Sequence, residues 1–190
     1  ETLADEPSED IEPVILITFL EHSSNDLPWR DLTNHTILRL PVDKNGFWNV
    51  EELDKTLSDY NLKKAYGRKR IAMVAMSGAS NVLGVCNDLK KTGEIVKRNG
   101  AKFLVDAAQL AAHKKVNIKE CDIDYLALSG HKVYAPFGSG LLVAKKGMLQ
   151  PDSERVKSAI ASGEENAGGI AALGKALLLL NSIGYDIISN

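Results

Sequence analysis

Residues 88–109 read DLKKTGEIVKRNGAKFLVDAAQ, a pattern that predicts a helix followed directly by a strand. Asp88 can cap the helix at its start, and Gly100 can end it. The apolar run at 101–109 then predicts a buried strand, and RIAMVAMS at 70–77 predicts another strand before the helix. A strand, a helix and a second strand in this order are typical of a βαβ unit with parallel strands.

The rest of the chain repeats this alternation. Asn49 and the acidic residues after it predict a helix at 49–60, directly behind a turn. From Pro151 onward the pattern is helical. Residues 168–184 have too many apolar side chains for one buried face, so burial on several sides is expected, with a partner as one way to cover them. Further strands are predicted at 13–20, 36–42, 122–130 and 140–147. The fold class that follows is α/β, a three-layer sandwich with a mostly parallel sheet.

The composition is that of a globular protein, with 44% hydrophobic and 25% charged residues in a chain of 190. A net charge of −2 gives no reason to expect binding to nucleic acid or to a membrane surface. The longest apolar runs fall well short of the roughly 20 residues that span a bilayer. The basic run KKAYGRKR at 63–70 is interpreted as a solvated connection, with an anion-binding patch as the alternative.

The two cysteines, Cys86 and Cys121, form no CxxC or metal-binding spacing, which favours a reducing, cytoplasmic location. DKNGFW at 43–48 lacks the glycine spacing of an EF-hand loop, so it predicts a turn and no metal site. The acidic start ETLADEPSEDIEP lacks the basic region of a signal peptide. Because the chain does not begin with Met, we expect a domain excised from a longer protein.

Polar side chains follow four of the predicted strands. In a mostly parallel sheet the chemistry gathers at the carboxyl ends of the strands, so these loops define a candidate site. The loops EHSSN, SGASNVLG, DAAQ and SGHK contribute His22, Asn81, Asp106, Gln109, Ser129, His131 and Lys132.

A lysine flanked by anion-binding donors is suited to one particular cofactor. Such a lysine can form a Schiff base with an aldehyde that also carries a phosphate, which is the requirement of pyridoxal 5'-phosphate. Asp106 ends the apolar run KFLVD, and a pyridinium nitrogen would supply the pairing that a buried carboxylate needs. The pattern therefore favours a pyridoxal-phosphate site around Lys132.

Four motifs occur in one order along the chain: EHSSNDLPW (21–29), SNVLG (80–84), FLVDAAQ (103–109) and SGHKVYAPFGSG (129–140). With these motifs the sequence resembles the large domain of class V aminotransferases, the branch of fold-type I pyridoxal-phosphate enzymes that contains cysteine desulfurases and selenocysteine lyases. The resemblance covers roughly Val14 to Met148 and, more weakly, SGEENAGGIAALGKALLLL.

The resemblance implies a role for each candidate residue. Lys132 would be the Schiff-base lysine and, with His22, a catalytic residue, while His22 would also stack on the cofactor ring. The implied cofactor contacts are Asp106 to the pyridine nitrogen, Gln109 to the phenolic oxygen, Ser129 and His131 to the phosphate, and Asn81 to the cofactor or the substrate carboxylate. Plainer interpretations remain for some of these residues: Asp106, Gln109 and Asn81 can serve only as turn formers, and His22 as a loop cap. His35 and His113 match no motif and are interpreted as surface or packing histidines.

Several family features have no counterpart in these residues. The upstream phosphate-binding loop, the small carboxy-terminal domain, its substrate-binding arginine and the nucleophilic cysteine are all missing, and neither Cys86 nor Cys121 lies where that cysteine would be. The segment between Met148 and Ser162 is shorter than in desulfurases, and SGEEN replaces the usual Gly-Thr-Pro-Asn type of sequence. Residues 1–190 are therefore expected to be a partial large, cofactor-binding domain.

The favoured function is that of a fragment of a pyridoxal-phosphate enzyme acting on an amino acid, most like a cysteine desulfurase. The resemblance also implies a homodimer. Alternatives within the family are a transaminase or a kynureninase-like lyase, and outside it a non-catalytic dimerisation domain. A nucleotide-binding domain is less well supported, because the sequence contains neither a GxGxxG nor a Walker motif.

Overall fold

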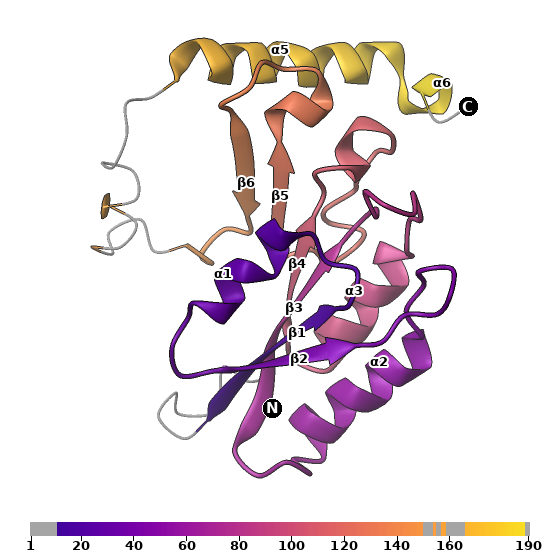
Figure 1. The fold of residues 1–190 in the computed structure, drawn as a ribbon, viewed down its shortest axis with the longest axis vertical. Helices are drawn as coiled ribbons and strands as arrows, with labels where there is room; N and C mark the ends of the chain where they lie inside the picture. The colour runs from indigo at the N-terminus through magenta and orange to yellow at the C-terminus, as the bar shows by residue number, and fades with distance from the viewer. Residues whose placement is uncertain (1–10, 150–153, 155–156, 159–165, 189–190) are drawn as a thin grey trace.

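A computed structural model describes residues 11–149, 154, 157–158 and 166–188. In this part of the chain six strands form one sheet in the order β2-β1-β3-β4-β5-β6, in which only β6 runs antiparallel to its neighbour (Figure 1). The strands are β1 (Glu12–Thr18), β2 (Thr36–Leu40), β3 (Lys69–Ser77), β4 (Lys102–Asp106), β5 (Tyr125–Ser129) and β6 (Gly140–Ala144). The prediction of a mostly parallel α/β sheet is confirmed.

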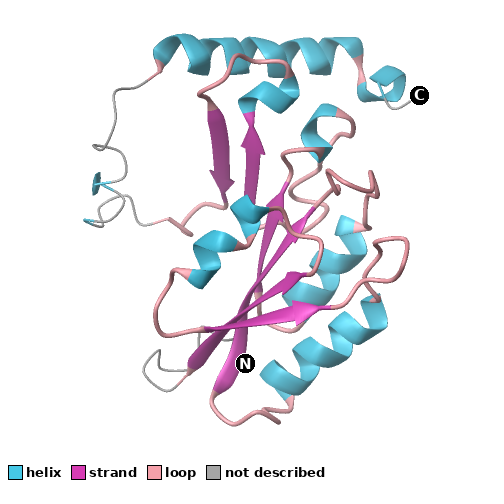
Figure 2. Cartoon of the chain, viewed as in Figure 1, coloured by secondary structure: helices cyan, strands magenta, loops and turns pink. Residues whose placement is uncertain are grey.

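Helices cover both faces of the sheet. Helices α2 (Val50–Leu57) and α3 (Leu89–Arg98) pack side by side on one face, and the short α1 (Leu27–Arg30) lies on the other (Figures 1 and 2). The side chains of Asn49 and Asp88 accept hydrogen bonds from the backbone at the starts of α2 and α3, as their positions in the sequence predict. The other helical segments are η3 (Ser23–Asn25), η4 (Ser58–Leu62), η5 (Leu110–Ala112), η6 (Gly130–Val133), α5 (Ala167–Ile183) and α6 (Tyr185–Ile188).

The side chains of β1 show why its apolar run has no polar alternation. Val14 and Leu16 join the large core beneath α2 and α3, whereas Ile15 and Ile17 pack on the opposite face with Trp29 of α1. All four of these β1 residues are buried. A strand covered on both faces is apolar at every position, which is typical of parallel sheets in α/β proteins.

Some element boundaries differ from the predictions. The first strand ends at Thr18, because the chain turns there and leaves Phe19 65% exposed. The predicted helix at 49–60 is regular only to Leu57, after which the wider turn η4 carries the chain toward β3. The helical pattern predicted just after Pro151 falls largely outside the described residues.

Helix α5 lies across the ends of β5 and β6 (Figure 1). One stripe of it is buried, including Leu173 and Leu180, while Ile170 and Leu178 are 57% and 68% exposed. No described segment covers the second face of α5, so burial of this helix on several sides, with a partner covering part of it, stays a prediction. Within the same described residues, no helix is long and apolar enough to cross a membrane.

Candidate functional site

A cavity of about 430 Å³ opens at the carboxyl ends of β1, β3, β4 and β5. All seven candidate residues line it, together with four residues that the sequence pattern did not single out: Ser24, Ser77, Ala79 and Ala108. The strand-end argument therefore correctly predicted where these side chains meet. What each of them does there remains a prediction.

Strand pairing brings the residues together. Ser77, the last residue of β3, is in register with Asp106, the last residue of β4, and Asp106 is in register with Ala127 of β5. Ser129 ends β5, so the chain reaches His131 and Lys132 within three residues of the strand. The parallel sheet thus collects groups that lie more than a hundred residues apart in sequence.

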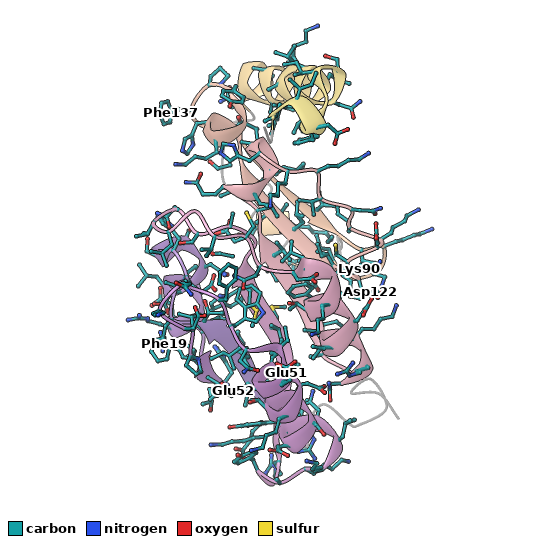
Figure 3. All side chains as sticks on the ribbon, turned by 90° about the vertical axis from the view of Figure 1, so that its right-hand side faces the viewer. Phe19, Glu51, Glu52, Lys90, Asp122 and Phe137 are labelled. Carbon is teal, nitrogen blue, oxygen red and sulfur yellow. The ribbon has the colours of Figure 1, made fainter. Side chains whose placement is uncertain are left out.

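Asp106 and His131 are held by local hydrogen bonds. One carboxylate oxygen of Asp106 accepts from the Ala108 N–H at 2.9 Å. The Oγ of Ser129 lies 2.8 Å from Nδ1 of His131, and the ring of Phe137 stacks on His131 with 4.9 Å between centroids. Phe137 is otherwise 82% exposed and projects away from the ribbon (Figure 3). These contacts orient the imidazole of His131, which lines the cavity.

The imidazole of His22 is oriented by the loop that follows it. Its Nδ1 accepts from the Ser24 N–H at 3.2 Å and lies 2.8 Å from the Ser24 hydroxyl. A backbone N–H can only donate, so Nδ1 is an acceptor and the neutral ring carries its proton on Nε2. The interpretation of His22 as a loop cap is therefore confirmed, because its side chain caps η3. The same residue also lines the cavity.

Lys132 lies in the short turn η6, whose backbone leaves little room. A Cβ atom at Gly130 would lie 2.2 Å from Oγ and 2.8 Å from the carbonyl oxygen of Ser139. Tyr134, which ends the turn, has a left-handed backbone with φ of 68°. Among the described residues, none is hydrogen-bonded to or ion-paired with the Lys132 amine, which is therefore available to a ligand.

A network around Glu21 supports the wall that carries His22. The carboxylate of Glu21 accepts from the hydroxyls of Thr18 and Ser77 and from Nδ2 of Asn25, the last two at 2.7 Å. Burial raises the pKa of Glu21, and the hydrogen bonds from Thr18, Ser77 and Asn25 act in the opposite direction. Sequence analysis missed this network, although a carboxylate directly before His22 and a serine ending β3 were its visible signals.

The cysteines lie elsewhere. Neither Cys86 nor Cys121 lines the cavity. Cys86 borders a neighbouring cavity of about 490 Å³, which shares Asn81 and Gln109 with the first and also contains His113. No group of three or more His, Cys, Asp or Glu side chains in the described part of the chain could hold a metal ion.

The fold and the cavity together define an α/β protein with a polar site at the carboxyl edge of a mostly parallel sheet. The family model for class V aminotransferases matches residues 10–190. The chain belongs to the class V aminotransferase family.

Known relatives agree with this assignment. The chain is 40% identical over 139 residues to a probable cysteine desulfurase of Halalkalibacterium halodurans, covering 72% of this chain and 32% of that protein. It is 31% identical over 200 residues to a probable cysteine desulfurase of Borreliella burgdorferi, covering 92% of this chain and 45% of the relative. The chain thus spans about a third to a half of the length of these two relatives.

Solved structures show the same fold. The apo structure of a cysteine desulfurase from Thermococcus onnurineus NA1 matches with a TM-score of 0.77 and 27% identity, over 95% of this chain and 48% of that one. A cysteine desulfurase from Escherichia coli matches over the same shares, with a TM-score of 0.73 and 27% identity.

Proposed function

We propose that this chain forms the cofactor-binding part of a pyridoxal-phosphate enzyme that acts on an amino acid, and that the enzyme is a cysteine desulfurase. The observation that carries the proposal is that four of the candidate residues line one and the same cavity: Lys132, Asp106, Ser129 and His131. The names of the relatives support the choice of reaction.

The residues present fit pyridoxal 5'-phosphate. The cavity volume of about 430 Å³ lies within the range of roughly 300–1,000 Å³ usual for ligand sites. It offers an unpaired amine, a carboxylate at a strand end, and hydroxyl and imidazole donors, which match an aldehyde, a pyridine nitrogen and a phosphate. Lys132 would attach the aldehyde, Asp106 would pair with the ring nitrogen, and Ser129 with His131 would bind the phosphate.

The remaining candidates would hold the ring and the substrate. His22 would stack on one ring face, Gln109 would donate to the phenolic oxygen, and Asn81 would contact the cofactor or the substrate carboxylate. When bound, the cofactor supplies an electron sink for the bonds of the substrate α carbon. Lys132 Nζ would take and return a proton at that carbon, and His22 would assist through Nε2.

Several parts of this proposal depend on the protein at its natural length. We propose a homodimer in the cytoplasm with a small amino-acid substrate, cysteine. A transaminase or a kynureninase-like lyase would use the same cavity with a different substrate. Release of alanine together with sulfane sulfur from cysteine would identify a desulfurase, whereas formation of a keto acid or cleavage of kynurenine would identify one of the others.

The test of the cofactor site is to mix the protein with pyridoxal 5'-phosphate, add borohydride, and locate the modified lysine by peptide mass spectrometry. Borohydride makes a lysine attachment permanent, so we expect the label on Lys132. The variant Lys132→Arg should lose the label. The matched control Lys146→Arg changes an exposed lysine just after β6 and should keep the label on Lys132. Labelling spread over surface lysines, or unchanged labelling of Lys132→Arg, would contradict the proposal.

A further inference from the structure

Glu21 is a carboxylate that the proposed chemistry does not use. It is not among the residues that line the cavity, yet it directly precedes His22 and is hydrogen-bonded to Ser77, which does line it. The contact between Glu21 and Ser77 spans 56 positions of sequence and joins the loop after β1 to the end of β3. Two walls of the cavity are therefore tied through this one side chain.

The same carboxylate also determines the shape of the loop that carries His22. It accepts from Asn25, a residue that is 4% exposed and whose Oδ1 in turn accepts from the indole N–H of Trp29 at 3.2 Å. The backbone N–H of Asn25 donates to the carbonyl oxygen of His22 at 2.8 Å. The turn from His22 to Asn25 is therefore anchored at both ends. This anchoring holds the Ser24 N–H where it donates to Nδ1 of His22.

We propose that Glu21 is a positioning residue that holds the imidazole of His22 in one orientation and one tautomer, with its proton on Nε2 facing the cavity. The inference concerns the free protein, and its consequence for catalysis rests on the proposed function. Buried polar networks in which every member is bonded stabilise one arrangement of their members, and this network has bonds at both carboxylate oxygens.

Substitution should release this constraint in a graded way. Glu21→Ala removes every acceptor, so the donors of Thr18, Asn25 and Ser77 lose their shared partner. Glu21→Gln keeps the size and one oxygen that can still accept from Asn25 and Ser77. Ser77→Ala removes only the link to β3. Glu52→Ala is a matched control, because it removes an exposed carboxylate on α2 that does not line the cavity.

The first measurement uses cofactor-free protein with isotope-labelled histidine, in which long-range ¹⁵N–¹H NMR reports the tautomer of His22. Wild type and Glu52→Ala should show one tautomer with a proton on Nε2. Glu21→Ala should show a mixture, Ser77→Ala a smaller change, and Glu21→Gln a spectrum near wild type. Unchanged His22 signals in Glu21→Ala overturn the proposal; should that variant fail to fold, unchanged signals in Ser77→Ala overturn it instead.

The second measurement is a double-mutant cycle on pyridoxal-phosphate affinity. Outer partners that orient a ligand residue typically change affinity by about 10–100-fold at metal sites. We expect Glu21→Ala to weaken binding roughly tenfold in wild type, but less than about twofold when His22 is already Ala. Equal losses in both backgrounds would show that Glu21 does not act through His22. Failure of wild type to bind the cofactor would overturn the proposed function alone, because the NMR result decides the role of Glu21 independently.

Discussion

At the scale of single residues, the cavity depends on short backbone contacts as much as on reactive groups. The turn that presents Lys132 requires Gly130, because a Cβ atom there would lie 2.8 Å from the carbonyl oxygen of Ser139, to which the Gly130 N–H donates. Gly138 has a φ of 87°, a conformation that glycine adopts at no steric cost. The contact between Gly130 and Ser139 depends on the three-dimensional path of the turn, and the sequence pattern does not predict it.

Gly130→Ala should therefore destabilise the protein and reduce cofactor labelling of Lys132. A backbone carbonyl cannot move as easily as a side chain, so the clash should cost roughly 1–3 kcal/mol in the free energy of unfolding. Gly174→Ala is the matched control: it lies within α5, where an added Cβ meets nothing within 4 Å, and should raise stability by up to about 1 kcal/mol. Urea unfolding of both variants checks the prediction, and equal stability of the two would contradict it.

At the scale of elements, one buried amide joins three segments. Asn61 in η4 donates to the carbonyl oxygens of Ile71 and Asn99, each at 2.9 Å, and accepts from the Ile71 N–H at 2.8 Å. These bonds connect η4 with β3 and with the residue that ends α3. Propensity along the chain predicts a helix through 49–60, but it cannot predict that the helix widens so that Asn61 reaches β3.

Asn61→Ala should lower the free energy of unfolding by roughly 1–3 kcal/mol, because buried backbone groups lose their partners. Asn45→Ala, at an exposed position of the turn before α2, should change it by less than about 0.5 kcal/mol. Thermal or urea unfolding of the two variants measures the difference. A loss at Asn61 no larger than the loss at Asn45 would show that water replaces these bonds without cost.

At the scale of the whole molecule, apolar side chains on α5 and α6 are unusually exposed. Ile170 and Leu178 of α5 are 57% and 68% exposed, and Ile187 of α6 is 71% exposed. On α5 the buried stripe consists of Gly169, Leu173, Ala176 and Leu180, whereas α6 has no buried residue. Tyr185 anchors α6 by donating to the Ala111 carbonyl oxygen at 2.9 Å, so these helices are docked on the sheet domain. Apolar surface on this scale marks contact with another segment or another chain.

We expect the protein to be a homodimer, and sedimentation equilibrium should give twice the mass of one chain. Coverage of α5 by a second copy would protect its backbone amides from hydrogen exchange more strongly at high concentration than at low. A mass equal to one chain at tens of micromolar would contradict the homodimer. In that case the exposed face of α5 would be covered within one chain.

Local patterns in the sequence are sufficient to predict the kinds of elements, the mostly parallel sheet and the set of polar residues at its carboxyl edge. These features are predictable because the spacing of apolar residues, the helix-capping residues and the polar residues that follow strands are local signals. In addition, the carboxyl ends of parallel strands lie at the same edge of the sheet. The three-dimensional structure was needed to show that Glu21, Ser24 and Ser77 support the cavity, and that α5 is buried along one stripe within the described chain. Hydrogen bonds between loops far apart in sequence depend on distances that no local pattern contains, so the bond from Ser77 to Glu21 becomes visible only when β1 and β3 lie side by side.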